Sequence, residues 1–526
     1  MTITTAKHPA RNGATLLPRL APLAAAAMLL AAPAQADVRV IPTFSSTLTY
    51  TDNVNQQAGE FKHSDMIGQF TPGVTVIGNS RRLQVSGTAQ WHQFAYLHDA
   101  GRNTNDSQRQ YSGALRGILV DDLLFVDASA ARGLQSTSAF GPQLGSDLYS
   151  RGNRTEVSSW RISPYLVHRF GRSATAQLRY TRDGVDAGDR NLFGKSIGDT
   201  VSLNLNSGTA FHTVAWGTSY YRQDLDNALT GESSTESVSA NLRYPLTPRF
   251  ALTADIGYDR YDFEGPGGKN AGRNWSGGFH WAPSQRTSLA ASLGRHFYGQ
   301  TGALDATHRS RRTVWNIKYT DGITTSRSQF LLPAAIDTAA MLDGLFLTAF
   351  PDEVERARMV AAYIAANGLP SSLADNVNYL SNRYMREKLL RGSVAYRLAR
   401  SSAVFGVYAS DRVALSDQQS DSPLLGSQLS SLNDNVRQRG ADATWTYQLN
   451  ARTSAIVAWD LRRSQSITTG LVDLQRTYRI GMTRRWEDRM LGVVELRHRI
   501  GGTGITVAGN PGYTENAVSA SLSMQF

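Results

Sequence analysis

Cysteine and long apolar runs are missing from the main part of this 526-residue sequence. The absence of cysteine excludes a disulfide framework, so the fold has to be held together by strand pairing and burial. Beyond residue 36 no stretch of about 18 apolar residues occurs, whereas a membrane-spanning helix needs roughly 20. The sequence therefore predicts no transmembrane helix after its N-terminal segment.

Motifs of catalysis and metal binding are also absent. The ten histidines show no H-E-x-x-H or comparable spacing, and neither a G-x-S-x-G elbow nor a phosphate-binding loop occurs. We therefore predict that the protein is not an enzyme and has no catalytic residues, no metal ligands and no cofactor. The formal charge of +11 is spread along the chain and lacks the basic stripe of a nucleic-acid-binding protein, which predicts no nucleic-acid partner.

The N-terminal segment has the three parts of an export signal. A basic region precedes the apolar segment Leu20–Ala32, and Ala34-Gln35-Ala36 follows as a small-x-small cleavage motif. This predicts a signal peptide over residues 1–36 and a mature chain over residues 37–526, with a retained anchor as the alternative. The basic residues of the signal are Lys7, Arg11 and Arg19, which leave +8 of the formal +11 to the mature chain.

The mature chain is rich in apolar–polar alternation with a period of two residues. The last segment carries apolar residues on one face and mostly serine on the other; the apolar ones are Val518, Ala520, Leu522, Met524 and Phe526. Alternating segments run about 10–13 residues, near the 9–11 that a tilted strand needs to cross a bilayer and above the usual soluble strand of about 5–6. The pattern predicts an all-β fold, a transmembrane antiparallel β-barrel over residues 37–526.

Short and long connections alternate along the chain with few breaks. The turn at 245–249 is an example of the short kind, and the Ser- and Asn-rich stretch at 413–435 of the long kind. In outer-membrane barrels the short turns face the periplasm and the long loops face outside. Counting on this rule predicts about 22 strands, within a range of about 18 to 24. Three of the predicted strands are 286–298, 310–320 and 323–332.

Residues 333–383 interrupt the alternation and are predicted to form a helical insertion. Within it, Asp352–Asn367 has the pattern of an amphipathic helix, with two acids at its start and Asn-Gly at its end. If Asp321-Gly322 is a tight hairpin turn, strand parity places the insertion outside the cell; a continuous strand there would place it in the periplasm. Folding inward as a plug is the third alternative, and we favour the loop side.

The end of the chain resembles the C-terminal strand signature of bacterial outer-membrane proteins. Phe526 is preceded by apolar residues at every second position, although Met524 stands where an aromatic residue is commoner. The resemblance implies that Phe526 is an assembly signal read by the barrel-assembly machinery. Together with the export signal, it predicts a location in the outer membrane of a Gram-negative bacterium, in contact with outer-membrane lipid.

Three further features resemble a narrower family, the PEP-CTERM system-associated outer-membrane proteins, which accompany exopolysaccharide loci. They are the segment Tyr50–Val54 at the end of the first strand, the recurring Arg-Ser/Thr turns, and Trp315–Phe330 followed by a helical insertion. The resemblance implies a role in exporting or handling an extracellular polysaccharide, with periplasmic polysaccharide-export proteins as partners. It supplies no catalytic residues.

Several charged residues alternate with the apolar ones and should face the lumen. A basic residue on the lipid face at midplane would cost roughly 2–4 kcal/mol, whereas a wet or internally paired lumen tolerates it. These residues either form paired ladders that stiffen the wall or line a mildly cationic passage for an anionic or neutral hydrated polymer. The candidates are Arg161, Arg179, Arg243, Asp255, Asp460, Arg479, Glu495, Arg497 and Arg499.

The sequence leaves more than one function open. The first hypothesis is an outer-membrane channel or export component for an extracellular polysaccharide. The alternatives are a structural or binding barrel that retains secreted polymer or protein at the cell surface, and a general nutrient porin. A barrel hydrolase is a further alternative without a supporting motif. A TonB-type transporter is disfavoured, because strands begin almost at Asp37 and leave no room for an N-terminal plug domain.

Overall fold

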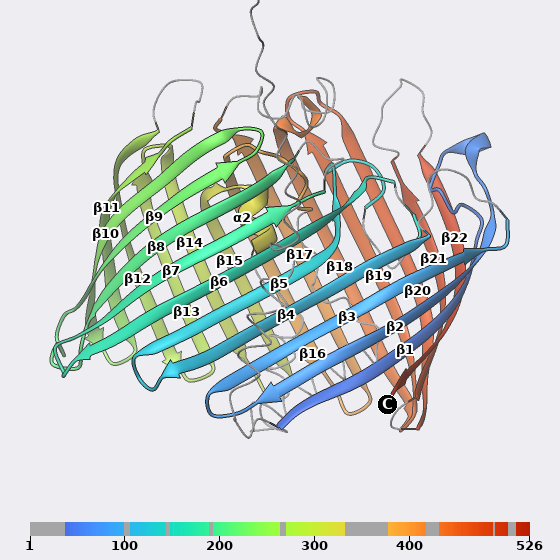
Figure 1. The fold of residues 1–526 in the computed structure, drawn as a ribbon, viewed down its shortest axis with the longest axis horizontal. Coiled ribbons are helices and arrows are strands. Elements are labelled where there is room, and N and C mark those ends of the chain that lie inside the picture. Colours follow the sequence, from blue (N-terminus) through green and yellow to red (C-terminus); the bar gives the residue numbers. More distant parts are fainter. Residues whose placement is uncertain are drawn as a thin grey trace, which may run out of the picture.

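A computed structural model shows a closed antiparallel β-barrel of 22 strands (Figure 1). This confirms the predicted fold class and strand number. The predicted signal peptide and most of the predicted insertion, including the helix expected over 352–367, lie outside the described residues. The structure describes residues 37–98, 106–143, 148–150, 152–188, 193–263, 270–331, 377–416, 431–487, 490–502 and 512–526.

The strands are between 10 and 17 residues long. In chain order they are β1 Asp37–Thr51, β2 Asp65–Asn79, β3 Leu83–Tyr96, β4 Ser107–Val120, β5 Leu124–Ser136, β6 Arg154–Phe170, β7 Ala174–Asp186, β8 Lys195–Ser207, β9 Ala215–Asn227, β10 Gly231–Thr247, β11 Phe250–Tyr261, β12 Ala271–Ser284, β13 Thr287–His296, β14 Gly299–Arg309, β15 Thr313–Thr324, β16 Met385–Arg397, β17 Ser401–Ala414, β18 Asn435–Asn450, β19 Thr453–Ser466, β20 Val472–Glu487, β21 Met490–Gly501 and β22 Tyr513–Gln525. The 3₁₀ helix η2 spans Gly59–Phe61, and the helix α2 spans Ser326–Leu331.

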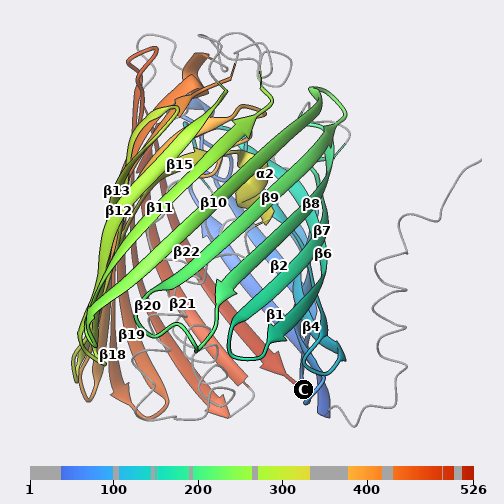
Figure 2. The same ribbon diagram turned by 90° about the vertical axis from the view of Figure 1, so that its left-hand side faces the viewer.

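Every strand pairs antiparallel with the next, and β1 pairs with β22 to close the barrel. The closing register runs from Thr43 opposite Gln525 to Thr51 opposite Ala517. Closure leaves no unpaired strand edge. A membrane-spanning sheet must be closed in this way, because hydrocarbon cannot hydrogen-bond to backbone groups. The strands run obliquely around the wall (Figure 2).

The two ends of the barrel differ in their connections. One end, the turn end, carries the start of β1, the end of β22 and tight turns such as Asn79 to Leu83. The opposite end, the loop end, carries the long connections. The predicted alternation of short and long connections is not general, because the loop-end connections β9–β10 and β13–β14 are as short as turns. By the orientation of outer-membrane barrels, the turn end faces the periplasm.

The wall has an apolar outer face and a polar inner face. On β11, Leu252, Ile256 and Tyr258 are exposed on the outer face. Asp255 alternates with them and accepts a hydrogen bond of 3.0 Å from the Ser276 hydroxyl of β12. Comparable exposed apolar side chains occur on strands all around the barrel, from Leu48 of β1 to Val518 of β22. This two-sided wall, closed on itself, is the architecture of an outer-membrane β-barrel.

The strand number is correct, but two strand assignments around residue 300 are wrong. The strand β14 was not predicted, because its outer face offers mainly Leu304 and small residues and its alternation is therefore weak. The predicted strand 323–332 is instead the last residues of β15 followed by α2. Thr325 caps this helix: the Ser328 N–H donates to Thr325 Oγ1 at 3.1 Å, and the Thr325 N–H donates to Ser328 Oγ at 3.2 Å.

Asp321-Gly322 is not a hairpin turn, which corrects a second expectation. Both residues lie within β15, where they pair with Lys388 and Glu387 of β16. A continuous strand would have placed the insertion at the periplasmic end, but the missed strand β14 reverses the parity. The insertion therefore leaves and rejoins the wall at the loop end, where Thr324 pairs with Met385. Among the described residues, no helix has the length and apolar character needed to cross a membrane.

The assignment of the two faces predicts a difference between two arginine substitutions on one strand. Ile256 is 65% exposed on the outer face, so Ile256→Arg should lower the free energy of unfolding by about 2–4 kcal/mol. The matched control Thr253→Arg places the same side chain on the inner face and should cost far less. Urea unfolding of both variants after reconstitution into lipid measures the difference. Equal destabilisation would contradict the assignment.

Candidate functional site

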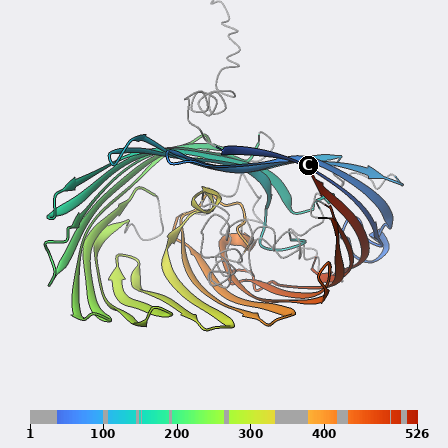
Figure 3. The same cartoon turned by 90° about the horizontal axis from the view of Figure 1, so that it is seen from below.

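The lumen at the loop end is occupied by segments that fold inward from the wall (Figure 3). They are α2, residues 377–384, residues 137–143 of the β5–β6 connection, and the helical turn 431–434 before β18. Their buried apolar side chains form clusters with wall residues at this end. α2, which directly precedes the predicted insertion, and residues 377–383, the described part of the insertion, thus both lie inside the barrel.

A buried ion pair joins α2 to the wall. The Arg327 guanidinium donates to the Asp183 carboxylate of β7 and, at 2.8 Å, to the Ser196 hydroxyl of β8. Arg327 is 6% exposed and Asp183 is 1% exposed. The Ser159 hydroxyl of β6 donates to the Phe330 carbonyl at 3.2 Å. Because removal of one partner of a buried pair leaves the other charge uncompensated, this contact holds α2 in place.

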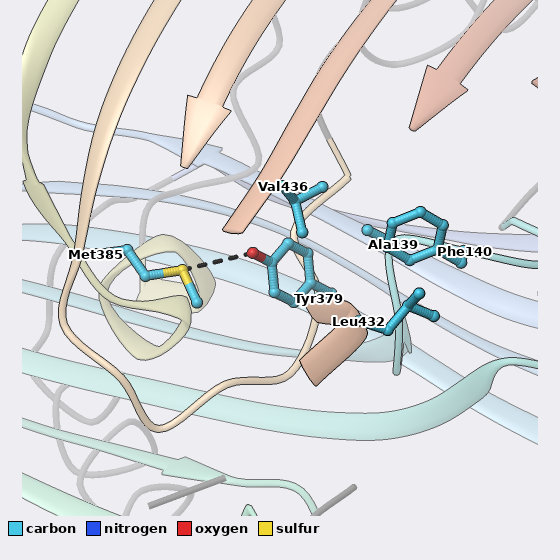
Figure 4. Packing of buried hydrophobic residues seen from close by; sticks show 6 residues of the cluster. All are labelled: Ala139, Phe140, Tyr379, Met385, Leu432 and Val436. Atoms are coloured by element: carbon cyan, nitrogen blue, oxygen red, sulfur yellow. Dashed lines mark hydrogen bonds between the residues drawn. The ribbon is translucent and has the colours of Figure 1, made fainter. Parts of the chain in front are cut away.

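Tyr379 connects the inward segments to one another (Figure 4). Its hydroxyl donates to the Asn433 carbonyl at 3.2 Å, and its own carbonyl accepts from the Ser326 hydroxyl of α2 at 2.6 Å. Its ring belongs to a buried cluster with Ala139, Phe140, Met385, Leu432 and Val436. α2, the end of the insertion, the β5–β6 connection and the start of β18 therefore pack as one body.

The β5–β6 connection crosses the lumen to the opposite wall. The Gly141 N–H donates to the Asp473 carboxylate of β20 at 2.7 Å, and the Gln475 side-chain amide donates to the Gly141 carbonyl. The Ser138 hydroxyl and the Ala139 N–H both donate to Asn433 Oδ1 at 3.1 Å. The described part of this connection thus narrows the lumen beside α2.

A second buried charge cluster lies where the barrel closes. Glu515 of β22 is fully buried and accepts from Arg497 of β21 at 2.8 Å. Arg499 approaches the other carboxylate oxygen at 3.5 Å, and the hydroxyls of Thr51 and Tyr149 each donate to the first at 3.2 Å. The cluster joins β1, β21 and β22 to the β5–β6 connection, and two arginines share one carboxylate.

A cavity of about 1030 Å³ lies in the lumen along β2 to β9. At the turn end it is lined by Asn79 and Gln84; towards the loop end it reaches Asp183 and Gln223. Most of its lining side chains carry hydroxyl, amide or charged groups. Because Asp183 is also the partner of Arg327, the cavity ends beside the residues that dock α2.

All nine residues predicted to face the lumen lie on the inner face, opposite the exposed apolar residues of their strands. The structure brings two sets of them together: Arg161 and Arg179 line the cavity, and Arg497 and Arg499 share Glu515. Asp460 lies 3.9 Å from Arg462 of its own strand. The others are spread around the wall: Arg243, Asp255, Arg479 and Glu495. Phe526 is on the outer face, where its N–H donates to the Pro42 carbonyl at 3.0 Å.

Three buried charged residues of these contacts were not predicted from the sequence: Asp183, Arg327 and Glu515. Glu515 occupies an inward position of the last strand, so the alternation alone could have identified it. Arg327 was assigned to a strand, and nothing local in the sequence indicates that it reaches β7. Residues of this kind are found only when the path of the connections through the lumen is known.

Aromatic residues near the strand ends, which could stack on sugar rings, lie in different environments. Trp275 and Tyr220 are on the outer face, where aromatic residues of outer-membrane barrels form girdles at the two membrane interfaces. Tyr221 lines the luminal cavity. Tyr298, in the β13–β14 connection, stacks on His296 with ring centroids 5.1 Å apart, and burial raises the pKa of its hydroxyl to about 12. Within the described ranges no three His, Asp or Glu side chains are placed to hold a metal ion.

No protein-family model and no curated protein matches this sequence. Similar solved structures include the siderophore receptor PirA from Pseudomonas aeruginosa, with 10% identity and a TM-score of 0.46 over 93% of this chain and 80% of that one. The FrpB iron transporter from Neisseria meningitidis (F5-1 variant) has 12% identity and a TM-score of 0.47 over 92% and 82% of the two chains. Similarity at this level identifies no ligand, partner or reaction for this chain.

Proposed function

We propose that this protein is a gated outer-membrane channel through which an extracellular polysaccharide is exported. The observation that carries the proposal is the luminal cavity of about 1030 Å³ that runs from the turn end to the residues that dock α2. By the orientation of outer-membrane barrels, this cavity faces the periplasm, where an exported polymer would enter. The inward segments cover its other end.

In this proposal the wall guides the polymer and the inward segments gate it. Hydroxyl and amide side chains, among them Ser163, Thr181, Thr200 and Gln223, line the cavity and can exchange hydrogen bonds with a hydrated chain as it moves. Opening requires α2 and the β5–β6 connection to leave their positions. The ion pair between Arg327 and Asp183 is the contact to break first, because it lies directly at the cavity.

The choice of a polysaccharide as the exported molecule rests on the resemblance to the PEP-CTERM system-associated outer-membrane proteins. Two features of the lumen support it: polar groups are distributed along the cavity, as passage requires, and those named above are neutral and suit sugar hydroxyls. Periplasmic polysaccharide-export proteins are the expected partners at the turn end.

A barrel that retains polymer at the cell surface is the second candidate. The apolar clusters at the loop end favour it, because they would keep a permanently sealed lumen. Such a barrel would act through its loops and not through its cavity.

Deletion of the gene separates these two functions. If the chain exports polysaccharide, the deletion strain should lose most of the polymer from the cell surface and from the medium and accumulate it in the periplasm. Quantification of polysaccharide in the three fractions, with the plasmid-borne gene as the control, measures this. Polymer that is instead released into the medium in normal total amount would contradict export and support retention.

A further inference from the structure

We infer that the luminal cavity contains a binding site for a carboxylate group of an acidic sugar chain, centred on Arg161. The inference rests on the proposed function and names the class of polysaccharide: one that carries carboxylates, such as a uronate polymer. It depends on three arginines from the part of the wall formed by β4 to β7, all of which line the cavity: Arg116 of β4, Arg161 of β6 and Arg179 of β7.

Two of these arginines already have a carboxylate partner. Asp127 of β5 accepts from Arg179 at 2.9 Å, and Arg116 approaches its other oxygen at 3.5 Å. Arg179 is also held by Tyr165, because its guanidinium lies 3.9 Å from the centre of that ring. Tyr165 stacks in turn on Phe125 at 5.1 Å between ring centres. The pair Arg116 and Arg179 is therefore fixed in place around one shared acid.

Arg161 has no such partner among the described residues. Its neighbours across the strands are Ser129 and Asp183, and Asp183 would be the natural counter-charge. The Asp183 carboxylate is instead ion-paired with Arg327 of α2. The Nε atom of Arg161 is buried without a hydrogen-bond partner. A buried guanidinium nitrogen without a hydrogen-bond acceptor raises the free energy of the protein, so a bound oxyanion that accepts this hydrogen bond is stabilised there.

The charged groups along the cavity leave room for an anion. Arg116, Arg161, Arg179 and the docked Arg327 face two carboxylates, Asp127 and Asp183, so two positive charges lack a counter-charge in this group. A guanidinium pairs with a carboxylate in a planar, two-pronged geometry. Nearby hydroxyls of Ser129 and Ser202 can bond to the hydroxyls of a sugar ring. A hydroxylated chain with carboxylates fits both features.

Calorimetric titration of the purified full-length barrel in detergent tests the site. The probes are trigalacturonate, which carries carboxylates, and maltotriose, a neutral chain of the same length. We expect trigalacturonate to bind more tightly than maltotriose. Arg161→Gln should weaken trigalacturonate binding about tenfold or more, because a charge-assisted hydrogen bond is lost, and should leave maltotriose binding unchanged. Arg161→Lys, which keeps the charge, should have a smaller effect.

The matched control is Arg243→Gln, which removes an inward arginine of β10 that does not line the cavity. It should leave trigalacturonate binding unchanged. An equal loss in both glutamine variants would overturn the site, because it would show a general positive potential of the lumen. Equal binding of the two trisaccharides, or displacement of trigalacturonate by inorganic phosphate at equal or lower concentration, would also overturn it.

Failure of this inference is distinguishable from failure of the proposed function. If the gene deletion stops export but titration shows no preference for trigalacturonate, the chain exports polysaccharide without this site. If export continues in the deletion strain, the proposed function is wrong whatever the titration shows.

Discussion

Replacing residues 325–384 by a short glycine-rich turn is expected to raise the single-channel conductance in planar bilayers about tenfold, since barrels of this width enclose a lumen that is open unless it is plugged. The replacement removes α2, its ion pair with Asp183, and the cluster around Tyr379. It spares the wall, because Thr324 and Met385 are already paired across β15 and β16 and need only a hairpin turn to join them.

The control for this variant is the same turn in place of residues 503–511, in another loop-end connection. It changes the length of the chain at the same end of the barrel and should leave conductance near that of the unaltered protein. The point variant Arg327→Ala should lie between the two, with more frequent openings of the intact insertion. An unchanged conductance in the long replacement would contradict the assignment of the insertion as the gate and would support the retention barrel.

Replacing Glu515 by alanine is expected to lower the free energy of unfolding by about 3–5 kcal/mol, the cost of removing one partner from a buried ion pair. The substitution leaves Arg497 and Arg499, which are 8% and 6% exposed, without their shared carboxylate. It also removes the acceptor of the hydroxyls of Thr51 and Tyr149. Urea unfolding in detergent micelles measures the effect.

Glu495→Ala is the matched control for this prediction. Glu495 is an inward glutamate of the same region of the wall, on β21, and it is only partly buried. Its replacement should change the free energy of unfolding by less than about 0.5 kcal/mol, as expected of a substitution away from buried networks. The double variant Glu515→Ala/Arg497→Gln should recover part of the loss. Equal effects of the two single alanine variants would show that the buried cluster contributes nothing to stability.

The sequence by itself determined the barrel and the inner-face position of the charged residues that alternate with apolar ones. A strand that separates hydrocarbon from a polar lumen must alternate, and the alternation is local, so Arg161, Arg179 and Arg497 could be placed on the inner face before any fold was known. The strand number followed from the same periodicity. It was correct although β14 was missed, because a false strand at 323–332 replaced it.

The contents of the lumen were decided only by the tertiary structure. The contacts that fill it join residues far apart in the chain: 144 positions between Asp183 and Arg327, 332 between Gly141 and Asp473, and 464 between Thr51 and Glu515. Alternation indicates which side of a strand faces lipid and which faces the lumen. A connection that folds inward packs instead against residues from distant parts of the chain, and local alternation does not indicate which residues these are. Closing the sheet brings those partners together, so the inward segments, the cavity and the Arg161 Nε that lacks a hydrogen-bond acceptor could not be predicted from local sequence.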